Sequence, residues 1–318
     1  MAFSPSDAAF EGFRLARRSP LTILLWALFY GLLTVVVLGV AGGPMANFMQ
    51  MAQGLEAGGE PTEAEMMAFM SAYFSFLGLI VPISLILGSI VLAAVNRAIL
   101  RPEERAFGYL RLGMDEVRVL VVQLALTVIL GLGFGLLAAV VFGTLGAAMG
   151  MANDSTGPIL GLVMFVAMIA FVGLVIWVAV RLSLAVPITV AERRIAIFDS
   201  WGMTRGHFWS LLGMALLALV LCLVVQILLS IVLMPILYFA AGGFENLTAL
   251  ETMAPMEIAR AMAPVAITIL VFSAIVSALQ AAIIYTPFAA AYQGLSGHGA
   301  DEVPPATTEP VEAPTPEL

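Results

Sequence analysis

Residues 181–209 read RLSLAVPITVAERRIAIFDSWGMTRGHFW, and this stretch decides the fold. It carries arginines and aromatic residues, and an uncharged, strongly apolar run lies on each side of it. Those runs are too long for the core of a soluble domain. We therefore expect the stretch at a bilayer surface, with its aromatic rings at headgroup depth and its arginines toward water.

The composition also indicates a chain dissolved mostly in lipid. Of the 318 residues, 62% are hydrophobic and only 11% are charged, whereas globular chains have roughly 25% charged residues. The net charge of -8 is concentrated locally, because nine of the acidic residues lie in one loop and in the C-terminal tail. This imbalance does not favour a nucleic-acid partner, and we expect none. The single cysteine, Cys222, lies in an apolar run and is expected to be buried and inert.

The lengths of the apolar runs predict an all-α, polytopic membrane protein with six transmembrane helices. The first run holds about 20 apolar residues, more than the 7–15 of a secretory signal, so we expect a retained span. Residues 41–67 are expected to form a polar loop, with a short helix after Pro61. The transmembrane domain is expected to cover residues 1–295, with spans at about 20–41, 71–96, 119–143, 157–181, 210–240 and 264–290.

The arginines predict the orientation of the spans. Twelve of the 13 lie before the first span, between the second and third, or between the fourth and fifth. These segments share one side of the membrane if six helices alternate, and arginine-rich segments face the cytoplasm. Both termini are therefore expected in the cytoplasm. The acidic, proline-rich tail at 296–318 is expected to be disordered there.

A short pattern before each odd-numbered span predicts an internal repeat. It recurs after 97 and then 91 residues, as Phe10-x-x-Phe13-Arg14-Leu15, Phe107-x-x-Leu110-Arg111-Leu112 and Phe198-x-x-Trp201-Gly202-Met203. Each copy precedes two spans. We therefore expect three units, each an interfacial helix followed by a helical hairpin, around an axis along the membrane normal.

The connector between the fourth and fifth spans resembles a known family. Its residues are Arg181-Leu-Ser-Leu-Ala-Val-Pro187, then Glu192, then Ser200-Trp201-x-Met203-Thr204-Arg205-Gly206-x-Phe208-Trp209. This order is similar to the glycerophosphoryl diester phosphodiesterase membrane domain. The resemblance implies a protein of the bacterial cytoplasmic membrane with no assigned activity. Some members carry a soluble phosphodiesterase barrel, but this chain is expected to stand alone, because the barrel needs about 250 further residues.

Arg205 is the leading candidate for contact with a lipid headgroup. If residues 195–209 form one helix, a rotation of about 100° per residue places Arg205 on the same arc as Trp201 and Trp209. Arg17 has the equivalent place in the first copy of the repeat, while the middle copy has a methionine there. A guanidinium among aromatic rings can hold a lipid phosphate through paired hydrogen bonds.

A simpler interpretation of Arg205 stays open. Its side chain can extend to water and anchor the helix, or it can pair with Glu192 or Asp199. The residues predicted to contact lipid headgroups are Arg17, Trp201, Arg205 and Trp209.

Other motifs have structural interpretations. Three alternating glycines at 131–135 lie mid-membrane without a preceding strand, so they predict close helix packing and not a phosphate loop. The same packing is expected around the glycine pairs at 146–150 and 157–161. His207 and His298 have no further ligands at helical spacing, so we expect no metal. Polar residues in the spans are expected to bond between helices, and a polar path is the alternative; they are Gln123, Gln226, Gln280, Ser84, Ser89, Thr127, Ser273 and Ser277.

The expected spans carry no Asp, Glu, Lys or Arg away from their ends. Ion-coupled carriers usually keep such groups at membrane depth, and neither an HExxH pair nor a GxSxG nucleophile is present. We therefore expect no enzyme and no cofactor, but a module that contacts membrane lipids or binds a protein partner, which the sequence does not identify. A carrier for a lipid or other amphiphile is the alternative. An enzyme acting on lipid headgroups, with Arg205 and His207, is a weaker one.

Overall fold

The computed structural model describes residues 4–57, 62–151, 156–242 and 255–297, and these ranges contain helices and no strand. Of the disordered tail expected at 296–318, Ser296 is the last residue of the final helix, and residues 298–318 lie outside the described residues. The elements are α1 (Pro5–Ala9), α2 (Glu11–Arg18), α3 (Pro20–Ala57), α4 (Glu63–Leu100), the 3₁₀ turn η1 (Ala106–Tyr109), α5 (Met114–Thr127), the π-helical η2 (Val128–Gly133), α6 (Phe134–Gly150), α7 (Gly157–Leu182), α8 (Ala185–Glu192), α9 (Asp199–Met203), α10 (Phe208–Ala240) and α12 (Pro255–Ser296).

Six helical stretches in the described ranges are long and apolar enough to cross a membrane. Each of the six expected spans falls within one of them, so the prediction of an all-α fold with six spans is confirmed, and the chain is a multi-pass membrane protein. A short helical segment precedes each odd-numbered span, but the middle one, η1, contains three consecutive residues with positive φ. The threefold repeat stays a prediction.

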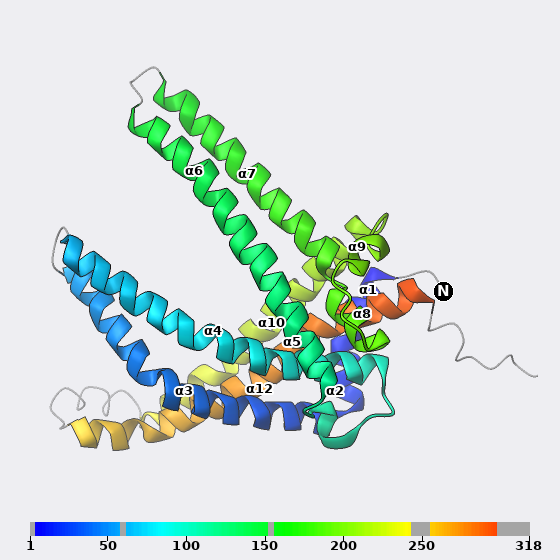
Figure 1. Ribbon diagram of the computed structural model, residues 1–318. Coiled ribbons are helices and arrows are strands. Elements are labelled where there is room, and N and C mark those ends of the chain that lie inside the picture. The colour runs from blue at the N-terminus through cyan, green and yellow to red at the C-terminus, as the bar shows by residue number, and fades with distance from the viewer. Residues whose placement is uncertain (1–3, 58–61, 152–155, 243–254, 298–318) are drawn as a thin grey trace, which may run out of the picture.

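The spans form three hairpins that diverge from a common base (Figure 1). We call "the base" the end of the molecule where α1, α2, α8 and α9 lie, together with the connector between α4 and α5. The hairpins are α3–α4, α5–α7 and α10–α12, and the ends of α3, α6 and α10 and the starts of α4, α7 and α12 lie away from the base. The α6–α7 arm points away from the other two hairpins.

The first two spans are longer than predicted. Helix α3 continues through Pro44 to Ala57, and α4 already begins at Glu63, so the polar loop expected at 41–67 is mostly helical. Alanine, methionine and glutamine favour helix in this stretch, and Thr62 and Glu65 form a capping box at the start of α4. The 38 residues of α3 extend about 57 Å at 1.5 Å per residue, which exceeds a hydrocarbon thickness of about 30 Å.

Side-chain packing concentrates at the base. Trp26 is fully buried in α3, and its indole Nε1 donates to the carbonyl oxygen of Gly108 at 2.7 Å, which ties α3 to the α4–α5 connector. Helix α2 crosses α12 at Gly12, where an added Cβ would lie 2.6 Å from the carbonyl oxygen of Ala282. Only glycine permits this approach of the two backbones, so Gly12 fixes α2 against α12.

The α6–α7 arm has little packing with the rest. Neither η2 nor α6 has a buried residue, and α7 buries only Val180 and Leu182 at the base. The two helices meet through Phe171, whose ring lies 5.9 Å from that of Phe134 and 5.6 Å from that of Phe142. The prediction of close packing at the glycines of 131–135, 146–150 and 157–161 is wrong, because no atom beyond the glycine's own surroundings lies within 4 Å of an added Cβ there.

One predicted interhelical hydrogen bond is present. Gln280 of α12 donates to the side-chain oxygen of Gln226 on α10 at 2.6 Å. The hydroxyls of Ser84, Ser89 and Ser273 instead donate to carbonyl groups of their own helices. The two glutamines therefore link α10 to α12, whereas the three serines form hydrogen bonds within their own helices.

Candidate functional site

The stretch from 195 to 209 is not one helix. It forms α9, a turn, and the start of α10, because Gly206 adopts a φ of 86° in the left-handed region. Glycine reaches this region without the steric cost of a Cβ. The prediction of a single helix is wrong. Arg205 therefore does not share one helical face with Trp201 and Trp209.

Helix α9 is held against the end of α7 by two hydroxyl groups. Ser200 Oγ donates to the carbonyl oxygen of Arg181 at 2.7 Å and accepts from the backbone N–H of Leu184 at 3.1 Å. Thr204 is fully buried; its hydroxyl lies 2.8 Å from the carbonyl oxygen of Ser200 in α9 and 3.4 Å from the carbonyl oxygen of Arg181 in α7. Carbonyl groups in the last turn of a helix lack intrahelical partners. Ser200 supplies a hydrogen-bond donor to such a carbonyl group of α7. This bond also positions the next residue, Trp201.

Trp201 forms one wall of an aromatic site around Arg181. Trp177 and Arg181 are four residues apart on α7, so their side chains share a face of that helix. The guanidinium carbon of Arg181 lies 5.6 Å from the ring centre of Trp177 and 5.8 Å from that of Trp201. The two indoles meet edge to face with centres 5.1 Å apart. These distances are within the range of cation–π attraction.

The guanidinium of Arg181 has hydrogen-bonding capacity that the protein does not use. Its Nε and Nη1 atoms are buried and have no hydrogen-bond partner. Among the residues that the structure describes, no carboxylate forms an ion pair with it. A buried donor without a partner is costly, and more so when it is charged. The site can therefore accept an anion with oxygen acceptors.

The other predicted contact residues lie elsewhere on the base. Arg205 is exposed in the turn between α9 and α10, and Arg17 is exposed on α2. Neither forms an ion pair within the described ranges, whereas the neighbouring Arg14 and Arg18 both pair with Glu11. Trp209 is 79% exposed in the first turn of α10. Contact of these side chains with lipid headgroups stays a prediction.

The carboxylates proposed as partners of Arg205 bind Arg194 instead. Arg194 contacts Glu192 and Asp199, each with a nitrogen–oxygen distance of 2.6 Å. Hydrogen bonds to Asp199 and then to Glu192 raise the pKa of Arg194 above its ordinary value. These ion pairs connect the end of α8 to the start of α9. They leave Arg205 available to water or to the membrane surface.

A second group of charges lies in the α4–α5 connector. Arg97 is fully buried near the end of α4, and it forms an ion pair with Glu116 in the first turn of α5. Its Nη1 also donates to the carbonyl oxygen of Tyr109. Glu116 accepts from the backbone N–H of Gly113 at 2.9 Å, which caps α5. The pair therefore joins α4 to α5 in the interior of the base.

This pair continues into a partly buried network around two carboxylates. Asp115 lies 2.5 Å from Arg101 and 2.9 Å from Arg118. Glu104 lies 3.3 Å from Arg101 and 3.1 Å from Arg193, which comes from the α8–α9 loop 89 residues later in the chain. Sequence reasoning used these arginines only to orient the spans. The spacing of Arg101 and Glu104, and of Asp115 and Arg118, predicts local pairs, but nothing in the sequence places Arg193 beside them.

No group of three or more His, Cys, Asp or Glu side chains that could hold a metal ion occurs in the part of the chain that the structure describes. No protein-family model, no curated protein and no solved structure matches this chain. The similarity to the glycerophosphoryl diester phosphodiesterase membrane domain stays a prediction based on residues 181–209. In the structure, Ser200, Thr204 and Gly206 of that motif position α9, and Trp201 covers Arg181.

Proposed function

We propose that the protein is a non-catalytic membrane module that holds an anionic lipid headgroup at Arg181. The bound group is the phosphodiester of a phospholipid. In this proposal, Trp177 and Trp201 lie at headgroup depth, and the guanidinium beside them donates to two phosphate oxygens. Arginine forms such paired hydrogen bonds with phosphate because its planar donors match the spacing of the oxygens.

One observation carries the proposal: the Nε and Nη1 donors of Arg181 are buried without an acceptor, beside two indole rings that contact each other. A structural arginine at a helix end usually pairs with a carboxylate or extends into water. Arg181 does neither among the described residues. Tryptophan is enriched at membrane interfaces, where the phosphate groups of lipids supply the missing acceptors.

We further propose that the base faces the cytoplasm of a bacterium and that the protein lies in its cytoplasmic membrane. Twelve of the 13 arginines belong to segments at the base, and Arg260 lies near the opposite end, in the first turns of α12. Arginine-rich loops remain on the cytoplasmic side during insertion. Both termini are then cytoplasmic. The bacterial origin rests on the family resemblance.

The test uses two variants that each remove one arginine from the same connector. Wild type, Arg181→Gln and Arg205→Gln are purified in detergent with phosphatidylglycerol, and lipid retention is measured by native mass spectrometry. Loss of charge-assisted hydrogen bonds is expected to weaken retention about 10-fold to 100-fold in Arg181→Gln. Arg205→Gln is expected to retain lipid as wild type does. Equal retention in all three proteins, or a loss confined to Arg205→Gln, contradicts the proposal.

A carrier for a lipid or other amphiphile is the second candidate. It is favoured by a cavity of about 410 Å³ between α3 and α12, whose lining is entirely apolar and could take part of an acyl chain. The cavity is lined by Leu24, Ala27, Leu28, Gly31, Leu32, Val35, Leu270, Val271, Ala274 and Ile275. A carrier is expected to accelerate movement of a fluorescent phospholipid between the leaflets of proteoliposomes. The module is expected to leave that rate at the protein-free value. An enzyme acting on lipid headgroups is the weaker alternative, and it requires turnover that Arg205→Ala or His207→Ala abolishes.

A further inference from the structure

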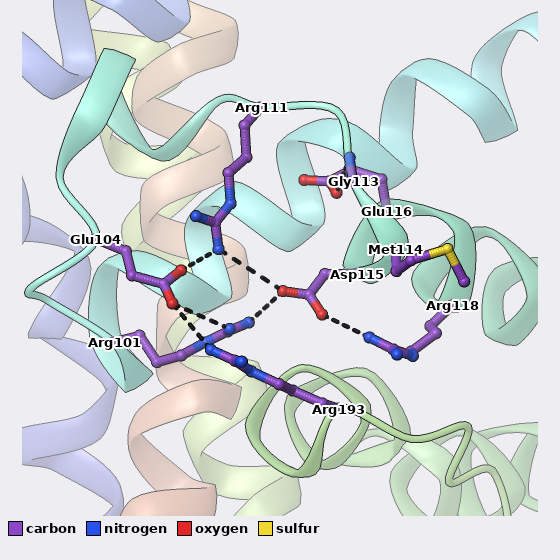
Figure 2. Close-up of a pocket in the computed structure, with 9 residues that line it drawn as sticks. All are labelled: Arg101, Glu104, Arg111, Gly113, Met114, Asp115, Glu116, Arg118 and Arg193. Carbon is purple, nitrogen blue, oxygen red and sulfur yellow. Dashed lines mark hydrogen bonds and ion pairs between the residues drawn. The ribbon is translucent and has the colours of Figure 1, made fainter.

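A charged cavity opens at the base, away from Arg181. Its volume is about 430 Å³, and side chains from the α4–α5 connector, the first turn of α5 and the α8–α9 loop surround it (Figure 2). Four of the lining residues are arginines and three are acids. The lining comprises Arg101, Glu104, Arg111, Gly113, Met114, Asp115, Glu116, Arg118 and Arg193.

The network that forms the cavity has an excess of positive charge. Counting the buried Arg97, five arginines and three carboxylates are joined by ion pairs among the described residues, which leaves two positive charges without a counterpart. The carboxylates are already shared: Glu104 contacts three arginines, and Asp115 contacts four within 4.0 Å. What this cavity lacks is negative charge. Low-dielectric walls strengthen the attraction of such a site for an anion.

The arginines can reach an anion without losing their structural contacts. Arg111 and Arg193 keep 47% and 61% of their side-chain surface exposed, and both extend toward the shared Glu104 in Figure 2. Each guanidinium has five N–H donors, and one carboxylate uses at most two of them. Deeper in the cavity, Nε of Arg101 is buried without a hydrogen-bond partner. Donors from three segments therefore surround one space.

We propose that this cavity binds a phosphate monoester dianion, with Arg111, Arg118 and Arg193 as its principal ligands. A monoester phosphate carries close to two negative charges near neutral pH, because its second pKa is about 6. This charge balances the excess of the network. Phosphate monoesters occur both in solution and on lipids of the phosphatidate type. The proposal does not depend on the lipid contact at Arg181, whose proposed ligand is a phosphodiester.

Two variants of one connector test the site. Arg111→Gln removes a charge that lines the cavity, and Arg105→Gln removes an exposed charge that does not. Binding of inorganic phosphate is measured at pH 8 by isothermal titration calorimetry, with the protein in phosphatidylcholine nanodiscs. We expect Arg111→Gln to weaken binding about 10-fold to 100-fold, since it removes charge-assisted hydrogen bonds. Arg105→Gln is expected to stay within about twofold of wild type, because exposed charges outside the site are screened by salt.

A second experiment identifies the source of the phosphate. It also includes a variant with an expected gain in affinity, which poor folding cannot produce. Nanodiscs that contain phosphatidic acid replace inorganic phosphate, and bound lipid is counted by native mass spectrometry. Binding of inorganic phosphate identifies a soluble ligand, and binding of phosphatidic acid alone identifies a lipid. Glu104→Gln removes a competing carboxylate, so it is expected to raise the affinity for whichever probe binds. The proposal is overturned if neither probe binds, if Arg111→Gln and Arg105→Gln bind alike, or if Glu104→Gln lowers the affinity.

Discussion

Replacing Arg97 with methionine isolates the energetic role of the buried ion pair at the base. Arg97 is fully buried, and the side chain of its partner Glu116 is only 6% exposed. Asp115, the other carboxylate near Arg97, keeps two closer arginine partners, so it stays compensated after the substitution. Glu116 loses its compensation, because within the described ranges its one other polar contact is the backbone N–H of Gly113.

The expected loss of stability follows from the unpaired charge that Arg97→Met leaves on Glu116. Removing one member of a buried ion pair costs about 3–5 kcal/mol, since the remaining charge stays desolvated. Adding Glu116→Gln removes that charge and keeps an oxygen that can accept from Gly113. The remaining cost of the double variant is about 1–2 kcal/mol, mainly for the lost hydrogen bond from Arg97 to the carbonyl oxygen of Tyr109. The double variant is therefore expected to be more stable than Arg97→Met alone by about 2 kcal/mol.

The assay is reversible unfolding of wild type, both single variants and the double variant in mixed detergent micelles, followed by circular dichroism. The coupling energy comes from the four free energies of unfolding. A double variant that is less stable than Arg97→Met would refute the reasoning. So would an Arg97→Met variant as stable as wild type, because Glu116 would then be compensated without the arginine.

Three further substitutions test the packing of the base and the contact between α10 and α12. Gly12→Leu is expected to lower the yield of folded protein in size-exclusion chromatography, since its Cβ would lie 2.6 Å from the carbonyl oxygen of Ala282; a wild-type profile contradicts the close crossing of α2 and α12. Trp26→Phe keeps an aromatic ring but leaves the carbonyl of Gly108 without its donor, at a cost of about 1–3 kcal/mol in the free energy of unfolding. Gln280→Leu removes the bond to α10 and is expected to destabilise by about 0.6–2 kcal/mol in the same measurement; a stabilised variant argues against the bond.

The lengths of the apolar runs predicted the six spans because lipid imposes strong constraints on sequence. A helix must satisfy its own backbone in hydrocarbon, so each span appears as a long uncharged run. The same reasoning underestimated the lengths of α3 and α4. Helix-forming residues extend α3 beyond its apolar run to Ala57, and they begin α4 at Glu63, before its apolar run. Hydropathy reports where lipid ends, not where the helix ends.

The candidate site could be predicted only in part, because it depends on contacts between distant segments. The sequence predicts a headgroup contact at Trp201, which stays a prediction, and it places Arg205 beside Trp201 only on the assumption of a continuous helix. The signal against that assumption was Gly206, which permits the left-handed turn. Arg181 was treated only as the start of a connector. Its proximity to both tryptophans arises when Ser200 binds the end of α7, and helical periodicity does not report such a contact.

The most direct test of the lipid contact is a nitrogen–phosphorus dipolar coupling between the guanidinium of Arg181 and the lipid phosphate. Solid-state NMR can measure it on protein with ¹⁵N-labelled arginine in phosphatidylglycerol bilayers. We predict a coupling that corresponds to direct hydrogen bonding in wild type, that disappears in Arg181→Gln, and that persists in Arg205→Gln. A wild-type spectrum without such a coupling, or one unchanged by Arg181→Gln, would contradict the account.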